Sequence, residues 1–300
     1  MEVIRSVRDL KAALRRLKTG RPDATVGFVP TMGYLHAGHA SLIERARREN
    51  DLVVLSVFVN PLQFGPNEDY ERYPRDAARD EAIARNAGVD VLFMPPVAEM
   101  YPREPAVRVR VGRLADRLCG ASRPGHFDGV ATVLTKLFHL VAPDRAYFGM
   151  KDAQQVAVVR RLAEDFNFPL EIVACPTVRE PDGLAMSSRN VYLSPDERRQ
   201  AVVLSQALEL AGRMLGAGDP AAGELEEALA RKIREAPLAD IDYVSVLTYP
   251  SLLALEGPVW RALEETEDRE LIVALAVRFG KTRLIDNRVF WKTEGELRHV

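Results

Sequence analysis

The sequence has few cysteines and no long apolar run, and each absence excludes a class of protein. Its two cysteines, Cys119 and Cys175, lie far apart and in no C-x-x-C pattern, which argues against a disulfide framework and against a thiolate zinc site. We expect two buried or half-buried free thiols. No apolar run approaches the ~20 residues of a membrane-spanning helix, and the first residues lack the apolar core of a secretory signal. The sequence therefore predicts a cytoplasmic protein without a membrane partner.

Neither sign of charge is in surplus. Lysine and arginine number 41 and aspartate and glutamate 43, which leaves a net charge of -2. A nucleic-acid-binding protein normally carries a basic surplus, so we expect no nucleic-acid partner and small-molecule substrates instead. The 300 residues, 47% of them hydrophobic, suffice for one large domain or two ordinary ones.

Several catalytic and cofactor-binding motifs are also missing. No G-x-G-x-x-G follows a predicted strand, and neither H-E-x-x-H nor G-x-S-x-G occurs, which excludes the sites that those motifs build. Gly280-Lys281-Thr282 resembles the end of a P-loop, but Leu275 stands where that motif needs its first glycine. We therefore exclude a P-loop.

The apolar patterning predicts two domains. Up to residue 180, apolar runs at 25–30, 52–59, 89–94, 146–148 and 170–174 alternate with helical patterns at 40–49, 75–87, 130–140 and 152–165. This alternation predicts an α/β domain with a Rossmann-like parallel sheet and helices on both faces. Residues 181–300 combine a helical region at 195–235 with strand-like runs at 243–247, 271–277 and 282–285, and predict a smaller α+β domain. We expect a hinge at 179–183, closure of the smaller domain over the nucleotide, and a loose tail at 291–300.

Two histidines follow the first predicted strand. His36 and His39 enclose Gly38, directly before a predicted helix. At a helix N-terminus, residues three apart share a face, close to unpaired backbone N–H groups and the positive end of the helix dipole. This arrangement suits a triphosphate, and imidazole N–H groups would donate most strongly as charge develops in the transition state. The alternatives are two exposed loop histidines, a metal site that lacks a third ligand, and a structural cap.

Two further groups of donors suit phosphate. Ser187, Ser188 and Arg189 are consecutive and offer two hydroxyls and a guanidinium, although the same residues could form a polar turn before the next helix. Lys151 follows a strand and Gly149 at a predicted helix start, and the alternative there is a solvated surface lysine.

The order of these groups resembles the signature pair of the adenylyl-transferring superfamily, which includes class I aminoacyl-tRNA synthetases and small nucleotidyltransferases. Longer segments, spread over residues 1–288, resemble the pantothenate synthetase family. They are FVPTMGYLHAGH at 28–39, FVNPLQFGPNEDY at 58–70, RYPR at 72–75, RPGHFDGVATV at 123–133, FGMKDAQQ at 148–155, GLAMSSRN at 183–190 and GKTRLIDN at 280–287. The resemblance implies a dimeric ligase that makes pantothenate, the precursor of coenzyme A, from ATP, (R)-pantoate and β-alanine with Mg²⁺. Its two steps form pantoyl adenylate and pyrophosphate, and then pantothenate and AMP.

The resemblance also implies site residues. The implied ATP-binding positions are Met32, Gly33, His36, Gly38, His39, Gly149, Met150, Lys151, Asp152, Val178, Met186, Ser187, Ser188 and Arg189. Of these, the implied catalytic residues are His36, His39, Lys151, Ser187, Ser188 and Arg189, with His39 at the position of the proton donor. The implied substrate-binding positions are Gln63, Gln155, Asn60, Tyr73 and Arg123.

Several details of the implied site stay open. Glutamine both donates and accepts, so two glutamines can read the hydroxyls of pantoate. Arg123 either binds substrate or braces the loop 123–127 from outside. Met150 departs from an acidic residue that is common in the family, and we expect its side chain to point outward. No protein ligand is assigned to Mg²⁺, which phosphate oxygens and water usually hold.

Other functions remain as alternatives. A nucleotidyltransferase would share H-x-G-H but lack the segments at 60–70 and 123–133. A non-catalytic nucleotide-binding protein would not need Lys151 or the two serines. An aminoacyl-tRNA synthetase is disfavoured because the sequence has no basic extension for tRNA.

Overall fold

The computed structural model describes residues 1–66, 68–293 and 296–300, and these form two compact units. The first unit comprises Met1–Ala115, Arg123–Gly149 and Val158–Cys175. The second comprises Asp116–Ser122, Met150–Ala157 and Pro176–Val300.

The first unit is built on a six-stranded parallel sheet, as the sequence predicts. The strand order is β1-β4-β3-β2-β5-β6, and neighbouring strands pair in parallel. The bounds are β1 Glu2–Ile4, β2 Val26–Thr31, β3 Leu52–Val57, β4 Val91–Phe93, β5 Arg145–Gly149 and β6 Glu171–Cys175. Their near-continuous apolarity is typical of strands that are covered on both faces.

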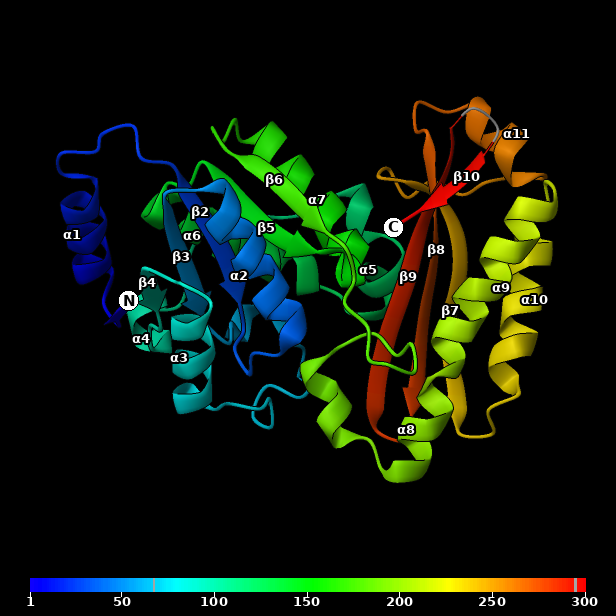
Figure 1. Cartoon of the computed structure of the whole chain (residues 1–300). Coiled ribbons are helices and arrows are strands. Elements are labelled where there is room, and N and C mark those ends of the chain that lie inside the picture. Colours follow the sequence, from blue (N-terminus) through cyan, green and yellow to red (C-terminus); the bar gives the residue numbers. More distant parts are fainter. Residues whose placement is uncertain (67, 294–295) are drawn as a thin grey trace. The chain divides into compact units, whose positions relative to one another are not determined.

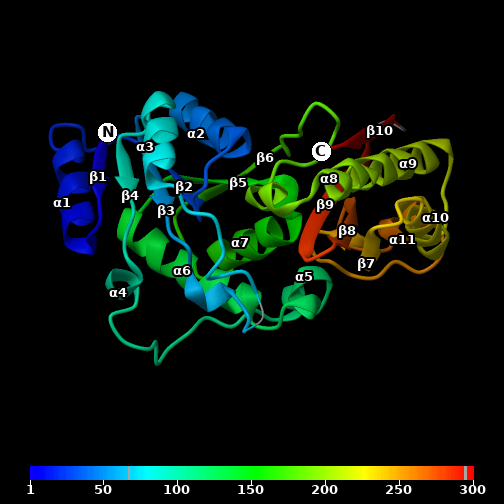
Figure 2. The same ribbon diagram turned by 90° about the horizontal axis from the view of Figure 1, so that it is seen from below.

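Helices cover both faces of this sheet (Figure 2). α2 (Ala37–Glu49) and α3 (Ala77–Asn86) lie on one face, and α6 (His126–Val141) lies on the other with α1 (Val7–Lys18) packed beside it. α1 is amphipathic and buries Leu10, Ala13 and Leu14. The short α4 (Val97–Met100), the turns Pro61–Gln63 and Arg113–Ala115, and residues 158–165 of α7 (Ala153–Asp165) complete the unit.

The strand order reverses between β2 and β5. β2, β3 and β4 follow one another towards one edge of the sheet, whereas β5 and β6 continue from β2 towards the other. In open parallel sheets, ligands bind beyond the carboxyl ends of the strands at such a reversal. The loop with the two histidines leaves the end of β2, and Gly149 ends β5, so this topology favours the predicted nucleotide site.

The second unit pairs a four-stranded antiparallel sheet with helices (Figure 1). The sheet order is β10-β9-β8-β7, with β7 Ala239–Tyr249, β8 Glu270–Phe279, β9 Thr282–Thr293 and β10 Glu296–His299. α9 (Val203–Ala217) and α10 (Ala222–Arg234) pack on it and bury Leu208, Leu229 and Ile233 against strand residues such as Val273. The remaining helices are α5 Leu118–Ser122, α8 Pro195–Ala201 and α11 Val259–Glu264, and α7 (Ala153–Asp165) contributes its first turn. The predicted smaller α+β domain is confirmed as a fold.

The Gly280–Lys281 turn joins β8 to β9, and Gly280 has φ +56°. A hairpin turn in the left-handed region is a place that favours glycine. The hairpin turn accounts for the glycine in Gly280-Lys281-Thr282 without any phosphate site, which agrees with the exclusion of a P-loop.

The expectation of a loose C-terminal tail is wrong. β9 extends to Thr293, β10 pairs with it antiparallel, and the backbones of Val289 and Val300 exchange two hydrogen bonds. Phe290 is fully buried and Leu297 packs against the core. The sequence of residues 291–300 is largely polar because one face of the edge strand β10 is exposed. Residues 294 and 295 of the expected tail lie outside the described residues.

The hinge at residues 179–183 stays a prediction, and the following contacts of this turn lie within the second unit. Arg179 forms a bidentate ion pair with the buried Asp286 of β9, at 2.7 and 3.0 Å, and also donates to the Gly183 carbonyl. Arg198 pairs with Glu180 and Asp182. The turn is therefore built into the second unit, which begins its longest segment at Pro176.

Candidate active site

The two histidines cap α2. His36 is the N-cap, with Nδ1 accepting from the Gly38 N–H at 3.1 Å, and His39 Nδ1 accepts from the His36 N–H at 3.3 Å. Each ring can keep its bond only while Nδ1 is unprotonated, so the neutral rings carry their protons on Nε2. The ring centroids lie 4.0 Å apart. The arrangement thus yields two neighbouring Nε2–H donors at a helix N-terminus.

The surroundings of His36 and His39 decide between the alternatives for these two residues. Both histidines are half-buried, which excludes two exposed loop residues. Within residues 1–66, 68–293 and 296–300, no group of three or more His, Cys, Asp or Glu side chains could hold a metal. The Nδ1 atoms form the structural cap, whereas the Nε2 atoms take no part in it. Capping and phosphate binding are therefore compatible in the same two rings.

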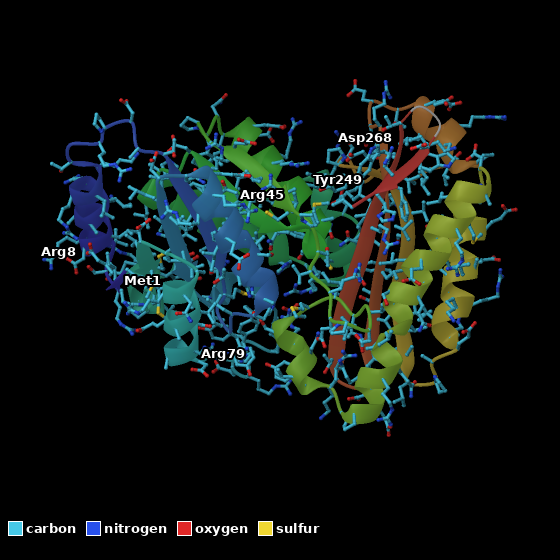
Figure 3. All side chains as sticks on the ribbon, viewed as in Figure 1. Met1, Arg8, Arg45, Arg79, Tyr249 and Asp268 are labelled. Atoms are coloured by element: carbon cyan, nitrogen blue, oxygen red, sulfur yellow. The ribbon has the colours of Figure 1, made fainter. Side chains whose placement is uncertain are left out.

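A buried carboxylate that the sequence did not single out shapes the histidine loop. Asp80 on α3 is 1% exposed, and its two oxygens accept from the backbone N–H groups of Tyr34 and Leu35 at 3.0 and 2.7 Å. Burial raises the pKa of this carboxyl, and the two N–H bonds oppose the shift. From the same helix, the Arg79 guanidinium lies 4.7 Å from the Tyr34 ring centroid (Arg79 is labelled in Figure 3).

The backbone of this loop needs a glycine. Gly33 has φ +85° and Tyr34 has φ +52°. A Cβ at position 33 would lie 2.7 Å from Val57 Cγ1 and 2.9 Å from Asp80 Oδ2. The signal in the sequence that could have found Asp80 is its position four residues before Ala84, on the buried face of α3. An acidic residue on such a face requires a partner.

Gln63 ends the short turn that follows β3. It is 7% exposed, its Oε1 accepts from Asn60 Nδ2 at 3.1 Å, and its Nε2 lies 3.2 Å from Met32 Sδ. Asn60 is 1% exposed and also donates to the Gly129 carbonyl at 3.1 Å. The structure thus brings together Met32, Asn60 and Gln63 in the first unit.

Arg123 braces the Gln63 loop. Its guanidinium binds both oxygens of Glu68, at 2.7 and 2.5 Å, and donates to the Gln63 carbonyl at 3.3 Å. His126 Nδ1 approaches the same carbonyl at 2.8 Å. Tyr73 is buried in an aromatic cluster, with its ring edge-on to Phe64. Arg123 therefore braces the Gln63 loop, whereas the alternative left open by the sequence was bracing of its own loop at 123–127.

A cavity of about 430 Å³ lies beside this loop. Its walls are residues 62–66 and 68, 108–110, 124–126 and 128–129. Of the predicted site residues, Gln63 lines this cavity, whereas His36 and His39 are not part of its lining.

In the second unit, Lys151 lies in the turn Met150–Asp152. Asn287 of β9 donates to the carbonyls of Met150 and Lys151 at 3.0 and 2.8 Å, which fixes this turn on the sheet. Burial lowers the pKa of Lys151, and the nearby charge of Arg189 lowers it further. Lys151 and Arg189 are both half-buried, and two like charges placed close enough to repel each other favour the binding of a polyanion beside them.

The serine-arginine segment forms one turn of 3₁₀ helix, Ser188–Tyr192, capped by Ser187. Ser187 Oγ accepts from the Arg189 N–H at 3.2 Å, and Ser188 is buried. The Met186 N–H donates to the Val178 carbonyl at 3.0 Å, so these two predicted positions are neighbours. Asn190 joins the segment to Glu180 and to the Ala185 carbonyl.

Three more predicted positions begin α7 or precede it. Asp152 accepts from the Gln155 N–H at 3.0 Å, which confirms it as the cap of this helix, and Gln155 is half-buried. The neighbouring Gln154 has a structural role instead. Its Oε1 accepts from the Cys119 N–H in α5, and its Nε2 donates to the Arg117 carbonyl just before that helix. The expectation that Met150 points outward is wrong, since the residue is 4% exposed.

Both cysteines are free and buried, as expected. In the described part of the chain, no helix has both the length and the apolarity that crossing a membrane requires.

A parallel sheet with H-x-G-H after β2 and a later Ser-Ser-Arg turn defines a protein of the adenylyl-transferring class. The profile of the family described as pantoate-beta-alanine ligase matches residues 2–289. The chain is 58% identical over 287 residues to the pantothenate synthetase of Geobacillus thermodenitrificans, a match that covers 96% of each chain. The crystal structure of pantothenate synthetase from Thermus thermophilus matches with a TM-score of 0.87 and 52% identity, over 96% of this chain and 98% of that one. The pantoate-beta-alanine ligase of Francisella tularensis, complexed with β,γ-ATP and β-alanine, matches with a TM-score of 0.76 and 34% identity, over 96% and 97% of the chains. The chain belongs to the pantoate–β-alanine ligase family.

Proposed function

We propose that this chain joins (R)-pantoate to β-alanine at the expense of ATP. The carboxylate of pantoate attacks the α-phosphorus of ATP and pyrophosphate leaves, which forms pantoyl adenylate. The β-alanine amine then attacks the activated carbonyl, and AMP leaves as pantothenate forms. The observation that carries this proposal is the pair of Nε2–H donors of His36 and His39 at the N-terminus of α2, in a chain of this family.

We assign the phosphate chemistry to residues of both units. His36 and His39 donate to phosphate oxygens that gain charge in the transition state, and His39 serves as the proton donor. Lys151 and Arg189 supply positive charge, and Ser187 and Ser188 supply hydroxyl donors. Met32, Gly33, Gly38, Gly149, Met150, Asp152, Val178 and Met186 complete the proposed ATP-binding set. Closure of the second unit over ATP remains a proposal.

Gln63 and Gln155 are the proposed pantoate-binding residues, with Gln63 also serving β-alanine. Asn60 supports this role through its bond to the Gln63 amide, and Arg123 and Tyr73 support it by fixing the loop. Mg²⁺ would accompany the triphosphate of ATP. The described residues offer no cluster that could hold that ion alone, and no step above depends on it.

We also propose a homodimer in the cytoplasm. Members of the resembled family are typically dimeric, and two free buried thiols suit a reducing compartment. Light scattering coupled to gel filtration tests the dimer, because a mass near that of one 33.4 kDa chain would exclude it.

Exchange of labelled pyrophosphate into ATP tests the two-step scheme. We expect exchange that requires pantoate and proceeds without β-alanine. Exchange that starts only when the amine is added would contradict an adenylate intermediate. Product analysis separates the alternative of a nucleotidyltransferase, which would leave a stable nucleotide adduct in place of AMP and pantothenate.

Replacement of His39 by alanine tests the proton donor. We expect turnover to fall roughly 10²-fold or more with a modest loss of ATP affinity, because the donor acts mainly in the transition state. Near-normal turnover would remove His39 from the catalytic set. His139→Ala is a matched control, since His139 lies on α6 with Nδ1 at the Thr135 carbonyl.

A further inference from the structure

A chain of hydrogen bonds leads from Tyr101, just after α4, to the Gln63 amide. The Tyr101 hydroxyl lies 2.9 Å from Asn60 Oδ1, and Asn60 Nδ2 lies 3.1 Å from Gln63 Oε1. All three residues belong to the first unit. None of the sequence motifs drew attention to Tyr101.

Backbone groups fix the orientation of the Asn60 amide. One end of that amide faces the Gly129 carbonyl at 3.1 Å, which can only accept, so this end is the NH₂ group. The other end faces the Leu62 N–H at 3.3 Å, which can only donate, so this end is the oxygen. The orientation therefore follows from partners whose donor and acceptor roles cannot change.

The fixed Asn60 amide determines the roles of its two side-chain neighbours. Tyr101 has to donate, because it meets the Asn60 oxygen. The Gln63 atom next to Asn60 Nδ2 has to accept, so it is Oε1. The Gln63 NH₂ group is then turned towards Met32, whose sulfur at 3.2 Å is a weak acceptor. A substrate oxygen would be a stronger acceptor than that sulfur.

The surroundings of Tyr101 keep it a donor. Burial raises the pKa of Tyr101 well above its usual range, so the phenol stays protonated. The Lys136 ammonium lies 5.4 Å from its ring centroid, and the Phe58 ring lies 6.0 Å from it. Asn60 is 1% exposed, so water offers little substitute for a lost partner.

We propose that Tyr101 is a positioning residue: its donated bond adds to the two backbone contacts that hold the Asn60 amide, and the held amide restricts Gln63 to donating towards the substrate. The site then selects an oxygen acceptor, a carboxylate or hydroxyl oxygen of pantoate, at this place. It does not accept a hydrogen bond there from a substrate amine or ammonium group. This inference rests on the proposed contact between Gln63 and pantoate.

Tyr101→Phe tests the inference, because phenylalanine keeps the ring and removes only the hydroxyl. We expect KM for pantoate to rise roughly three- to tenfold, as for the loss of one hydrogen bond, with KM for ATP unchanged. Tyr147→Phe is the matched control. Its hydroxyl also bonds side chains, Asn50 at 2.6 Å and Glu49 at 2.9 Å, yet neither is a proposed site residue. The control should lose thermal stability and keep both KM values.

A double-mutant cycle shows whether Tyr101 acts through Gln63. In a Gln63→Ala background, Tyr101→Phe should have no further effect on KM for pantoate, because the group it positions is gone. Equal effects of Tyr101→Phe in both backgrounds would overturn the inference. So would an unchanged KM in Tyr101→Phe when Gln63→Ala raises it. If Gln63→Ala itself leaves KM for pantoate unchanged, the proposed role of Gln63 fails instead.

Asn60→Asp offers a second route to the same result if the tyrosine variant does not fold. The introduced carboxylate can accept from Tyr101 and from the Leu62 N–H but cannot donate to Gln63 Oε1, so the Gln63 amide should turn its NH₂ group towards that carboxylate. We expect a loss of pantoate affinity of roughly tenfold or more in calorimetric titration. Wild-type affinity in this variant would overturn the inference.

Discussion

Asp80 acts on the histidines through the backbone. Both of its oxygens are used by the Tyr34 and Leu35 N–H groups. Asparagine at this position has one oxygen, and its NH₂ group would meet an N–H group without an acceptor. We predict that Asp80→Asn lowers kcat roughly tenfold or more and destabilises the fold by about 1–3 kcal/mol. Steady-state kinetics and thermal unfolding measure the two effects.

Asp76 provides the matched control for Asp80, because it caps the same helix. Its side chain begins α3 by accepting from the Arg79 N–H at 3.0 Å. Asparagine caps a helix as well as aspartate does, so Asp76→Asn should leave kcat near the wild-type value. Equal losses of kcat in both variants would show that any change in α3 disturbs the site, and that the Asp80 bonds have no special role.

Lys151 carries a charge that is costly to bury. Because burial lowers its pKa from the usual 10.5, the ammonium loses its proton at a lower pH than an exposed lysine does. We predict that the affinity for ATP falls as pH rises through this lowered pKa. In Lys151→Arg the charge persists throughout, so its ATP affinity should depend less on pH across the alkaline range. Parallel pH profiles for the two proteins would exclude Lys151 as the source.

At the scale of elements, α6 depends on a glycine where it meets the Gln63 loop. A Cβ on Gly129 would lie 2.3 Å from the Leu62 carbonyl oxygen and 2.6 Å from the Gln63 N. Both are backbone atoms, so the turn Pro61–Gln63 would have to move. We predict that Gly129→Ala raises KM for pantoate and lowers the melting temperature. Gly223→Ala on α10, with no atom within 4 Å of its Cβ, should instead stabilise the protein by roughly 0.5–1 kcal/mol.

The sequence predicted those features of the site that depend on neighbours along the chain. The cap at His36 and the cap at Asp152 need only the next few residues. Asp80 contacts Leu35, Tyr101 contacts Asn60, and Asn287 contacts Lys151. Those pairs are distant in sequence, and hydrophobic periodicity carries no information about which polar residues meet. These bracing residues therefore became visible only in the folded chain.

The elements show the same division. Apolar runs predicted a parallel sheet with helices on both faces, because strands that are buried on both faces are almost entirely apolar in sequence. The reversal of strand order between β2 and β5 leaves no recognisable pattern in the amino-acid sequence. The edge strand β10 was mistaken for a tail because its outer face is polar.

At the scale of the molecule, the two units are not two stretches of sequence. Asp116–Ser122 and Met150–Ala157 belong to the second unit although they lie between elements of the first. A linear boundary near residue 180 cannot represent such segments. The catalytic set we propose follows the same division, since His36 and His39 belong to the first unit and Lys151 and Arg189 to the second.

The stability of the whole molecule should depend on pH through two carboxyl groups whose pKa values shift in opposite directions. Burial alone would raise the pKa of Glu68, but the hydrogen bonds and charge of Arg123 lower it overall. Its stabilising effect is therefore present above the usual glutamate pKa and is lost as pH falls through the lowered one. Asp80 behaves in the opposite way. Because its folded-state pKa is raised, its destabilising charge is present at neutral pH and disappears in acid.

Glu68→Gln separates these contributions. The variant should unfold at a lower temperature than the wild type at neutral pH, since the Arg123 guanidinium then lacks its charged partner. As pH falls below the lowered pKa of Glu68, the wild type loses the same ion pair, so the two melting temperatures should converge. Glu104→Gln is the control, because that side chain is 88% exposed and its 3.5 Å pair with Arg108 lies on the surface. A gap between Glu68→Gln and the wild type that stays constant from neutral to strongly acidic pH would show that packing, and not the charge of Glu68, stabilises this loop.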